Sequence, residues 1–68
     1  MPGIYKVIEV VGTSPNSFAE AVKSAVADAA ETVRHMEWFE VVNQRGRIVD
    51  GGVEEFQVTV KLGFKIEK

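Results

Sequence analysis

Residues 49–53 read Val49-Asp50-Gly51-Gly52-Val53, and this stretch decides the fold. A two-residue hairpin turn needs positive φ angles, which Asp-Gly and Gly-Gly pairs adopt readily. After the turn, residues 53–66 alternate apolar and polar side chains, as a half-buried strand does. Before it, residues 38–45 alternate in the same way, and the pattern extends toward Val49. The sequence therefore predicts an antiparallel hairpin of two long strands.

A strand and a helix precede this hairpin. Residues 4–11 are rich in β-branched side chains and predict a first strand that ends at Gly12. Ser17 and Glu20 have the spacing of a capping box, so we expect a helix from Phe18 to Arg34 or His35. Positive or titratable groups at that end would suit the helix C-terminus. Apolar residues spaced by three and four form one stripe of the helix: Phe18, Ala21, Val22, Ala25, Val26, Ala29 and Val33.

The element order is β-α-β-β, which predicts the α+β class. We expect residues 1–68 to form a single domain in which one helix covers one face of a three-stranded antiparallel sheet. A domain of 68 residues without disulfides has a small core and is marginally stable alone. Assembly into an oligomer is therefore the expected source of further stability.

Composition excludes several functional classes. Cysteine is absent, so disulfides and thiolate chemistry are excluded, and a single histidine, His35, argues against a transition-metal site. A net charge of −2 argues against nucleic acid as a partner. No apolar run is long enough to span a membrane, and residues 1–6 lack the pattern of a signal peptide. The expected location is the cytoplasm.

The predicted hairpin register gives each side chain a face. A turn at Asp50-Gly51 or Gly51-Gly52 places Phe39 and Val41 on the same face as Val60 and Leu62, under the helix. The opposite face then carries Trp38, Glu40, Val42 and Gln44 together with Gln57, Thr59 and Lys61. The only tryptophan thus points away from the core of its own chain. Because native proteins rarely leave long bare strands with exposed aromatic residues, we expect a homo-oligomer with this face at an interface or at a pocket between subunits.

Such a face could hold a flat heteroaromatic ligand. The indole of Trp38 offers a stacking surface, Gln57 or Gln44 offers amide donors and an acceptor, and Arg45 could pair with a phosphate. The alternative is that Trp38 simply packs at a subunit interface, where tryptophan is enriched. The pattern of residues alone leaves both interpretations open.

Several spaced motifs resemble one known family. They are residues 11–17 (VGTSPNS), 38–41 (WFEV), Arg45-Gly46, 49–51 (VDG) and 56–64 (FQVTVKLGF). These segments, together with the chain length and element order, are similar to the bacterial dodecins over nearly the whole chain.

The resemblance implies a hollow homo-dodecamer that binds flavins in pairs near its symmetry axes and serves in flavin storage, buffering and photoprotection, with no catalytic residues and no metal. It implies that Trp38 stacks on the isoalloxazine, that Gln57 bonds its polar edge and that Arg45 contacts the phosphate of FMN. Some bacterial members also bind coenzyme A, for which we match no motif here.

Two other functions stay open at this point. One is a ligand-free structural or regulatory oligomer, in which protein would cover Trp38. The other is a tautomerase-like enzyme, in which removal of Met1 would expose the amine of Pro2 as a base. That chemistry needs cationic groups near the amine to stabilise an enolate, and the sequence places none there.

Overall fold

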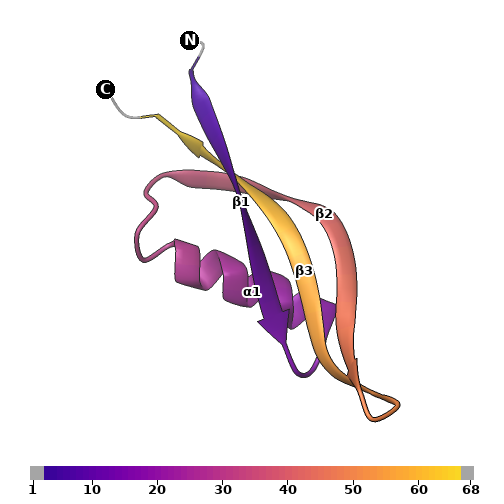
Figure 1. The fold of residues 1–68 in the computed structure, drawn as a ribbon. Coiled ribbons are helices and arrows are strands. Elements are labelled where there is room, and N and C mark those ends of the chain that lie inside the picture. Colours follow the sequence, from indigo (N-terminus) through magenta and orange to yellow (C-terminus); the bar gives the residue numbers. More distant parts are fainter. Residues whose placement is uncertain (1–2, 67–68) are drawn as a thin grey trace.

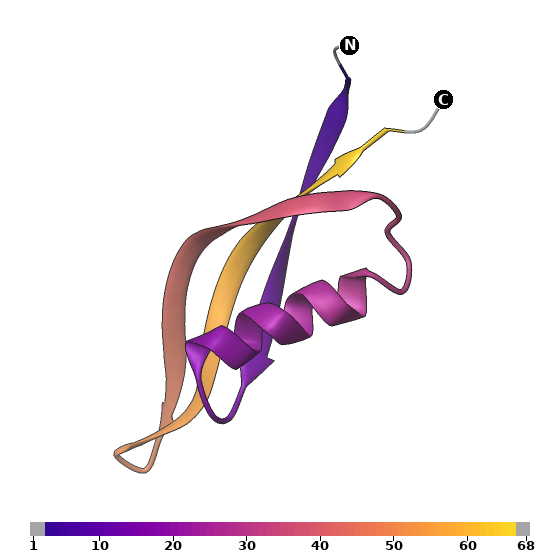
Figure 2. The same ribbon diagram turned by 180° about the vertical axis from the view of Figure 1, so that it is seen from behind.

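The computed structural model describes residues 3–66 of the chain. The elements are β1 (Tyr5–Ser14), α1 (Phe18–Ala29), β2 (Met36–Val49) and β3 (Gly52–Lys65). The strands form one antiparallel sheet in the order β1-β3-β2, and α1 lies across one face of it (Figure 1). From behind, β2 and β3 are seen to curve past the N-terminal end of α1 to the hairpin tip (Figure 2). The predicted α+β fold and β-α-β-β order are confirmed.

The hairpin turn has the predicted geometry. Asp50 and Gly51 have φ angles of 53° and 79°, and Val49 pairs with Gly52. Positive φ at both central residues matches the right-handed twist of the flanking strands. β1 differs from the prediction, because it continues through Gly12 to Ser14.

The hydrophobic core lies between α1 and the middle of the sheet. Among the described residues, five hydrophobic side chains are buried, from α1 and from alternate positions of β3: Ala21, Ala25, Val58, Val60 and Leu62. From β1, Ile8 and Val10 pack against them. Phe18 adds an edge-on contact with Phe56, with ring centroids 5.0 Å apart. The predicted apolar stripe faces the core from Phe18 to Ala29, but its last member, Val33, lies beyond the end of the helix. The core is as small as the chain length suggests.

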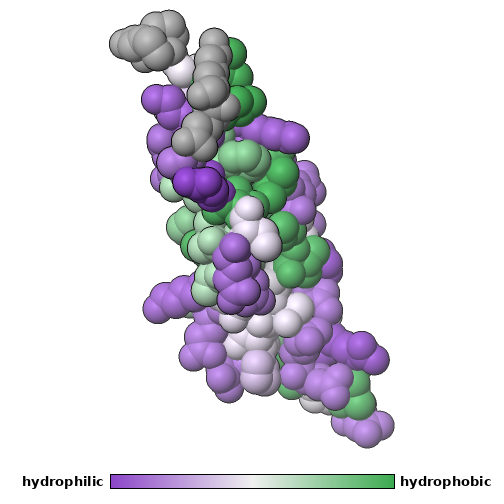
Figure 3. Space-filling model, turned by 90° about the vertical axis from the view of Figure 1, so that its left-hand side faces the viewer, coloured by the Kyte–Doolittle hydropathy of each residue, from purple (hydrophilic) through white to green (hydrophobic). Residues whose placement is uncertain are grey.

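The folded chain is long and thin, with extents of 52 × 20 × 13 Å. Hydrophobic side chains stay exposed along it, and Figure 3 shows them between hydrophilic ones on one side of the molecule. They lie on both faces of the sheet. On the helix side, α1 packs on β1 and β3, so β2 stays uncovered and its residue Phe39 is 52% exposed. Within the described part of the chain, no helix is long and apolar enough to cross a membrane.

The start of α1 is capped by a small hydrogen-bond network. The Ser17 hydroxyl accepts a bond from the Glu20 backbone N–H at 3.0 Å, as predicted. The Glu20 carboxylate does not return to Ser17. It accepts from Asn16 Nδ2 at 2.9 Å and from the Ser14 hydroxyl at 3.2 Å, while Ser14 Oγ accepts from the Asn16 N–H at 2.9 Å. Half of the predicted capping box is therefore confirmed. The N–H of Ser17 donates to Ser14 Oγ, at the end of β1, and not to the Glu20 carboxylate.

This network predicts a dependence of stability on pH. The hydrogen bonds from Asn16 and Ser14 lower the pKa of Glu20 from its ordinary value of 4.5. A depressed carboxyl pKa stabilises the fold above the unfolded value, and that contribution is lost as the pH falls through the folded value. We expect Glu20→Gln to lower the denaturation midpoint at pH 7 but to have a diminishing effect below about pH 4.5. Glu31→Gln, beyond the other end of the helix, is the control. A Glu20→Gln effect that is constant from pH 7 to pH 3 would contradict this role.

The end of α1 corrects the prediction. The helix does not run to Arg34 or His35. It ends at Ala29, and Ala30 is its C-cap residue. The N–H groups of Thr32 and Val33 both donate to the Ala29 carbonyl, and His35 has a φ of 65°, which no helix accommodates. No basic residue lies in the last helical turn, so the predicted interaction with the helix dipole is absent. The residues after Ala30 form the connection to β2.

Candidate functional site

A β-bulge at Val42 determines which side chains reach the face of the sheet opposite α1, here called the outward face. Val41 pairs with Val60, but Asn43 pairs with Thr59, so Val42 is an extra residue in β2. The register therefore shifts by one position beyond the bulge. Gln44 lies opposite Val58 on the helix side, and Arg45 lies opposite Gln57 on the outward face. The predicted outward position of Gln44 is wrong. Of the two glutamines considered for binding a ligand, only Gln57 lies on the outward face.

Trp38 lies on the outward face, as predicted, and is 42% exposed. It pairs with Gly63, and a Cβ atom at that glycine would collide with the indole ring. The missing side chain thus lets the indole lie directly on β3. Tyr5 of β1 packs against it edge-on, with ring centroids 5.3 Å apart and planes at 60°. The glycine below and the tyrosine beside it hold the indole in place, and it still offers exposed surface for stacking.

Arg45 and Gln57 form the centre of a polar cluster on the same face. Arg45 Nε donates to Gln57 Oε1 at 2.7 Å. Its Nη1 donates to Thr59 Oγ1 at 3.0 Å and to Asn43 Oδ1 at 3.2 Å. The other end of the glutamine, Nε2, donates to Glu55 Oε1 at 2.8 Å. The bulge is what makes this cluster possible, because it brings the guanidinium onto the outward face.

The aromatic and polar parts of the site are separate within one chain. Trp38 lies opposite Gly63, six residues along β3 from Gln57. At about 3.3 Å per strand residue, this separation is about 20 Å. The structure therefore brings Arg45 to Gln57 but brings neither of them to Trp38. A ligand that contacts all three must draw them from more than one chain.

Sequence reasoning gave no role to five contributors to these two groups, which are Gly63, Tyr5, Asn43, Thr59 and Glu55. Gly63 interrupts an otherwise alternating strand, which is a recognised sign of close approach by another group. Tyr5 and Asn43 become neighbours of the site only once the strand pairing is known, whereas Thr59 had been placed on the outward face without a role. Glu55 is two residues before Gln57, so alternation predicts the same face for both, but its bond to the amide is visible only in the structure.

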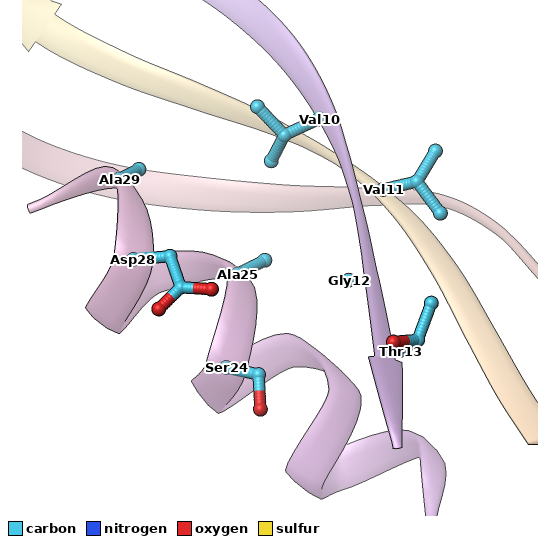
Figure 4. A pocket seen from close by; sticks show the side chains of 8 residues that line it. All are labelled: Val10, Val11, Gly12, Thr13, Ser24, Ala25, Asp28 and Ala29. Carbon is cyan, nitrogen blue, oxygen red and sulfur yellow. The ribbon is translucent and has the colours of Figure 1, made fainter.

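A separate hollow lies between β1 and α1 and contains none of the predicted site residues (Figure 4). Residues 10–13 of β1 and Ser24, Ala25, Asp28 and Ala29 of α1 line it. Over residues 3–66, no three His, Cys, Asp or Glu side chains gather in a way that could hold a metal ion. The outward face therefore remains the candidate site.

Comparison with known proteins gives the chain its family. The family model for dodecin matches residues 4–67, almost the entire sequence. The chain belongs to the dodecin family. Dodecin from Thermus thermophilus is 44% identical over 68 residues, covering 100% of this chain and 99% of that protein. The structure of dodecin from Streptomyces coelicolor is 50% identical, with a TM-score of 0.95, and the match covers 97% of this chain and 94% of that one.

A relative from Mycobacterium tuberculosis carries a different ligand in its name. It is a calcium dodecin, 30% identical over 63 residues, and the match covers 93% of this chain and 89% of that protein. Its crystal structure, described as having a novel calcium-binding site, matches with a TM-score of 0.84 over 94% of this chain and 91% of that one. A dodecin of the same fold is thus described as binding calcium.

Family membership answers the question of catalysis. Dodecins are small ligand-binding proteins rather than enzymes, they form oligomers, and a dodecamer is known for the family. The tautomerase alternative rested on Pro2, which lies outside the described residues. Membership in a family of binding proteins argues against that alternative.

Proposed function

We propose that this dodecin binds FMN and serves as a flavin store and buffer that also protects against flavin photochemistry. One observation carries the proposal: the outward face presents an exposed indole lying on a glycine, and an arginine bonded to a glutamine. An indole face stabilises a stacked heteroaromatic ring by about 1–3 kcal/mol, by analogy with nucleobases. An amide matches the polar edge of a pyrimidine-like ring, and a guanidinium matches a phosphate.

Each residue has a distinct role in this proposal. Trp38 stacks on the isoalloxazine and quenches its excited state. Gln57 bonds the polar edge of the ring system. Arg45 contacts the phosphate of FMN. With Nε and Nη1 bonded to neighbouring side chains, Arg45 keeps Nη2 without a hydrogen bond among residues 3–66, and this group would face the phosphate.

The proposed site needs more than one subunit. A ring system stacked on Trp38 does not reach Gln57 of the same chain across about 20 Å of strand. We therefore propose that Trp38 and Gln57 meet across a subunit interface within a hollow dodecamer. The surface supports assembly, because apolar residues of both sheet faces stay exposed, among them Phe39 beside Val22 and Val26 of α1.

The role of Arg45 gives a test that separates FMN from unphosphorylated flavin. Arg45→Ala is expected to weaken FMN binding more than riboflavin binding, and to lower the ratio of the two affinities about fivefold. Isothermal titration of both ligands into the purified assembly measures this ratio. Riboflavin binding also falls somewhat, because Gln57 loses the guanidinium that holds its carbonyl oxygen.

Arg47→Ala is the matched control for this test. Arg47 carries the same charge on the same strand, but it pairs with Glu54 at 3.3 Å in an exposed setting. We expect it to leave the ratio unchanged. If Arg45→Ala keeps the wild-type ratio, Arg45 does not contact the phosphate. If the wild-type assembly binds no FMN, the proposed function is wrong.

Other ligands and assignments have less support in the structure. Coenzyme A is a second ligand to titrate, on the resemblance alone. Of the relatives described above, calcium is named only for the one from M. tuberculosis. The described residues contain no cluster of three or more carboxylates that could hold it. A ligand-free scaffold would leave Trp38 covered by protein and unresponsive to flavin. The cytoplasmic location stays a prediction.

A further inference from the structure

Gln57 is held at both ends of its side-chain amide by groups of opposite charge. Its Oε1 accepts from Arg45 Nε at 2.7 Å, and its Nε2 donates to Glu55 Oε1 at 2.8 Å. A guanidinium has only donors and an ionised carboxylate has only acceptors. Rotating the amide by 180° would place N–H against N–H and oxygen against oxygen. The two neighbours therefore select one orientation of an amide that would otherwise be free to take either.

We propose that Glu55 is a positioning residue that sets what Gln57 can recognise. This inference rests on the proposed flavin function and deepens it. With one hydrogen and one lone pair already used, Gln57 keeps one N–H and one carbonyl lone pair for a ligand. They match a ring edge on which a carbonyl lies beside an N–H, as in an imide. The N3–H and its flanking carbonyls give a flavin that edge.

Glu55 and its neighbour Glu54 differ in a way that makes the assignment specific. Glu55 lies two residues before Gln57 on β3, so strand alternation puts it on the outward face in line with the amide, whereas the irregularity between Arg47 and Ile48 makes Glu54 the extra residue of the strand. Glu54 instead pairs with Arg47 at 3.3 Å, and its side chain is 55% exposed. Two adjacent glutamates of equal charge thus have separate partners, and only one of them contacts the amide.

The test measures recognition of the imide edge rather than affinity alone. Riboflavin and N3-methylriboflavin are titrated into the wild-type assembly, Glu55→Gln and Glu54→Gln. The methyl group removes the N3–H, so the ratio of the two affinities reports the hydrogen bond made there by Gln57. Charge-assisted bonds are roughly twice as strong as neutral ones, so Glu55→Gln should lower this ratio about fivefold. Glu54→Gln changes the net charge equally and should leave the ratio as in the wild type.

The outcomes separate this inference from the proposed function. If the wild type binds riboflavin and Glu55→Gln keeps its ratio, the positioning role is overturned and the flavin site stands. An equal fall in Glu54→Gln would also overturn it, because charge alone would then explain the effect. If the wild type binds no flavin, both proposals fail. If Glu55→Gln does not assemble, Glu55→Asp is used in its place. It keeps the charge but moves the carboxylate away from Gln57 Nε2. An unchanged ratio of the riboflavin and N3-methylriboflavin affinities in that variant overturns the inference.

Discussion

Replacing Trp38 with alanine is expected to lower the affinity for FMN by about 3 kcal/mol, or roughly 150-fold, while the assembly stays intact. The loss is large because the indole supplies the stacking surface, and its neighbours cannot replace it. Gly63 has no side chain, and Tyr5 presents itself edge-on to the indole. Isothermal titration measures the affinity, and light scattering measures the mass of the assembly.

Trp38→Phe is the matched control for this variant. A phenyl ring keeps a smaller stacking face, so its affinity should fall between those of the wild type and Trp38→Ala. Full flavin affinity in Trp38→Ala would show that the site lies elsewhere. Collapse of the assembly in both variants would instead support the alternative in which Trp38 serves as interface packing.

Replacing Gly12 with alanine is expected to destabilise the fold by about 3 kcal/mol, at the upper end of what overpacking costs. A Cβ atom at this position would collide with the backbone carbonyl of Ala21 and lie 2.8 Å from Ala25 Cβ. These atoms belong to the face of α1 that forms the core, so the helix must move away from β1. A chemical denaturation midpoint, followed by circular dichroism, measures the effect.

Gly52→Ala is the control for this second variant. A Cβ atom there would have only the Val49 carbonyl within reach, at 3.8 Å, which is ordinary contact distance. We expect a change within about 0.5 kcal/mol, as for most exposed substitutions. If Gly12→Ala is as stable as Gly52→Ala, the close approach of α1 to β1 does not limit the packing of the core.

The parts of the fold that could be predicted are those set by local chemistry. Residues 50–52 predicted a turn at Asp50-Gly51 or Gly51-Gly52, and both turns put Phe39 and Val41 on the face of Leu62 and Val60, as observed. The register set by the turn holds there because the extra residue in β3, Glu54, and the extra residue in β2, Val42, offset each other. Ser17 predicted the start of the helix. In each case a residue type and its spacing determine the local backbone geometry within a few residues. Contacts with distant parts of the chain therefore change that geometry little.

The parts that could not be predicted depend on distant contacts. The adjacent apolar residues Val41 and Val42 break the alternation of β2, but only pairing with Thr59 shows that Val42 is a bulge. Without that bulge, Gln44 would have taken the place of Arg45 on the outward face. The helix end was missed because no glycine or proline follows Ala30, and the bonds to the Ala29 carbonyl are visible only in the structure.

The separation of Trp38 from Gln57 explains why the candidate site looks incomplete in one chain. Sequence reasoning placed the two side chains on the same face, and the structure confirms this. It gave no estimate of how far apart they lie along the strands. A shared face shows that two residues can belong to one interface, whereas contact with one ligand also requires the arrangement of subunits.

An FMN titration of the purified assembly, followed by tryptophan fluorescence, tests the central claim most directly. Trp38 is the only tryptophan, so the signal reports on that single position of the chain. We predict strong quenching of both the indole and the flavin, saturating near one FMN per subunit. Unchanged tryptophan emission at high micromolar FMN, with the assembly intact and free of bound flavin beforehand, would contradict a stacked flavin at Trp38.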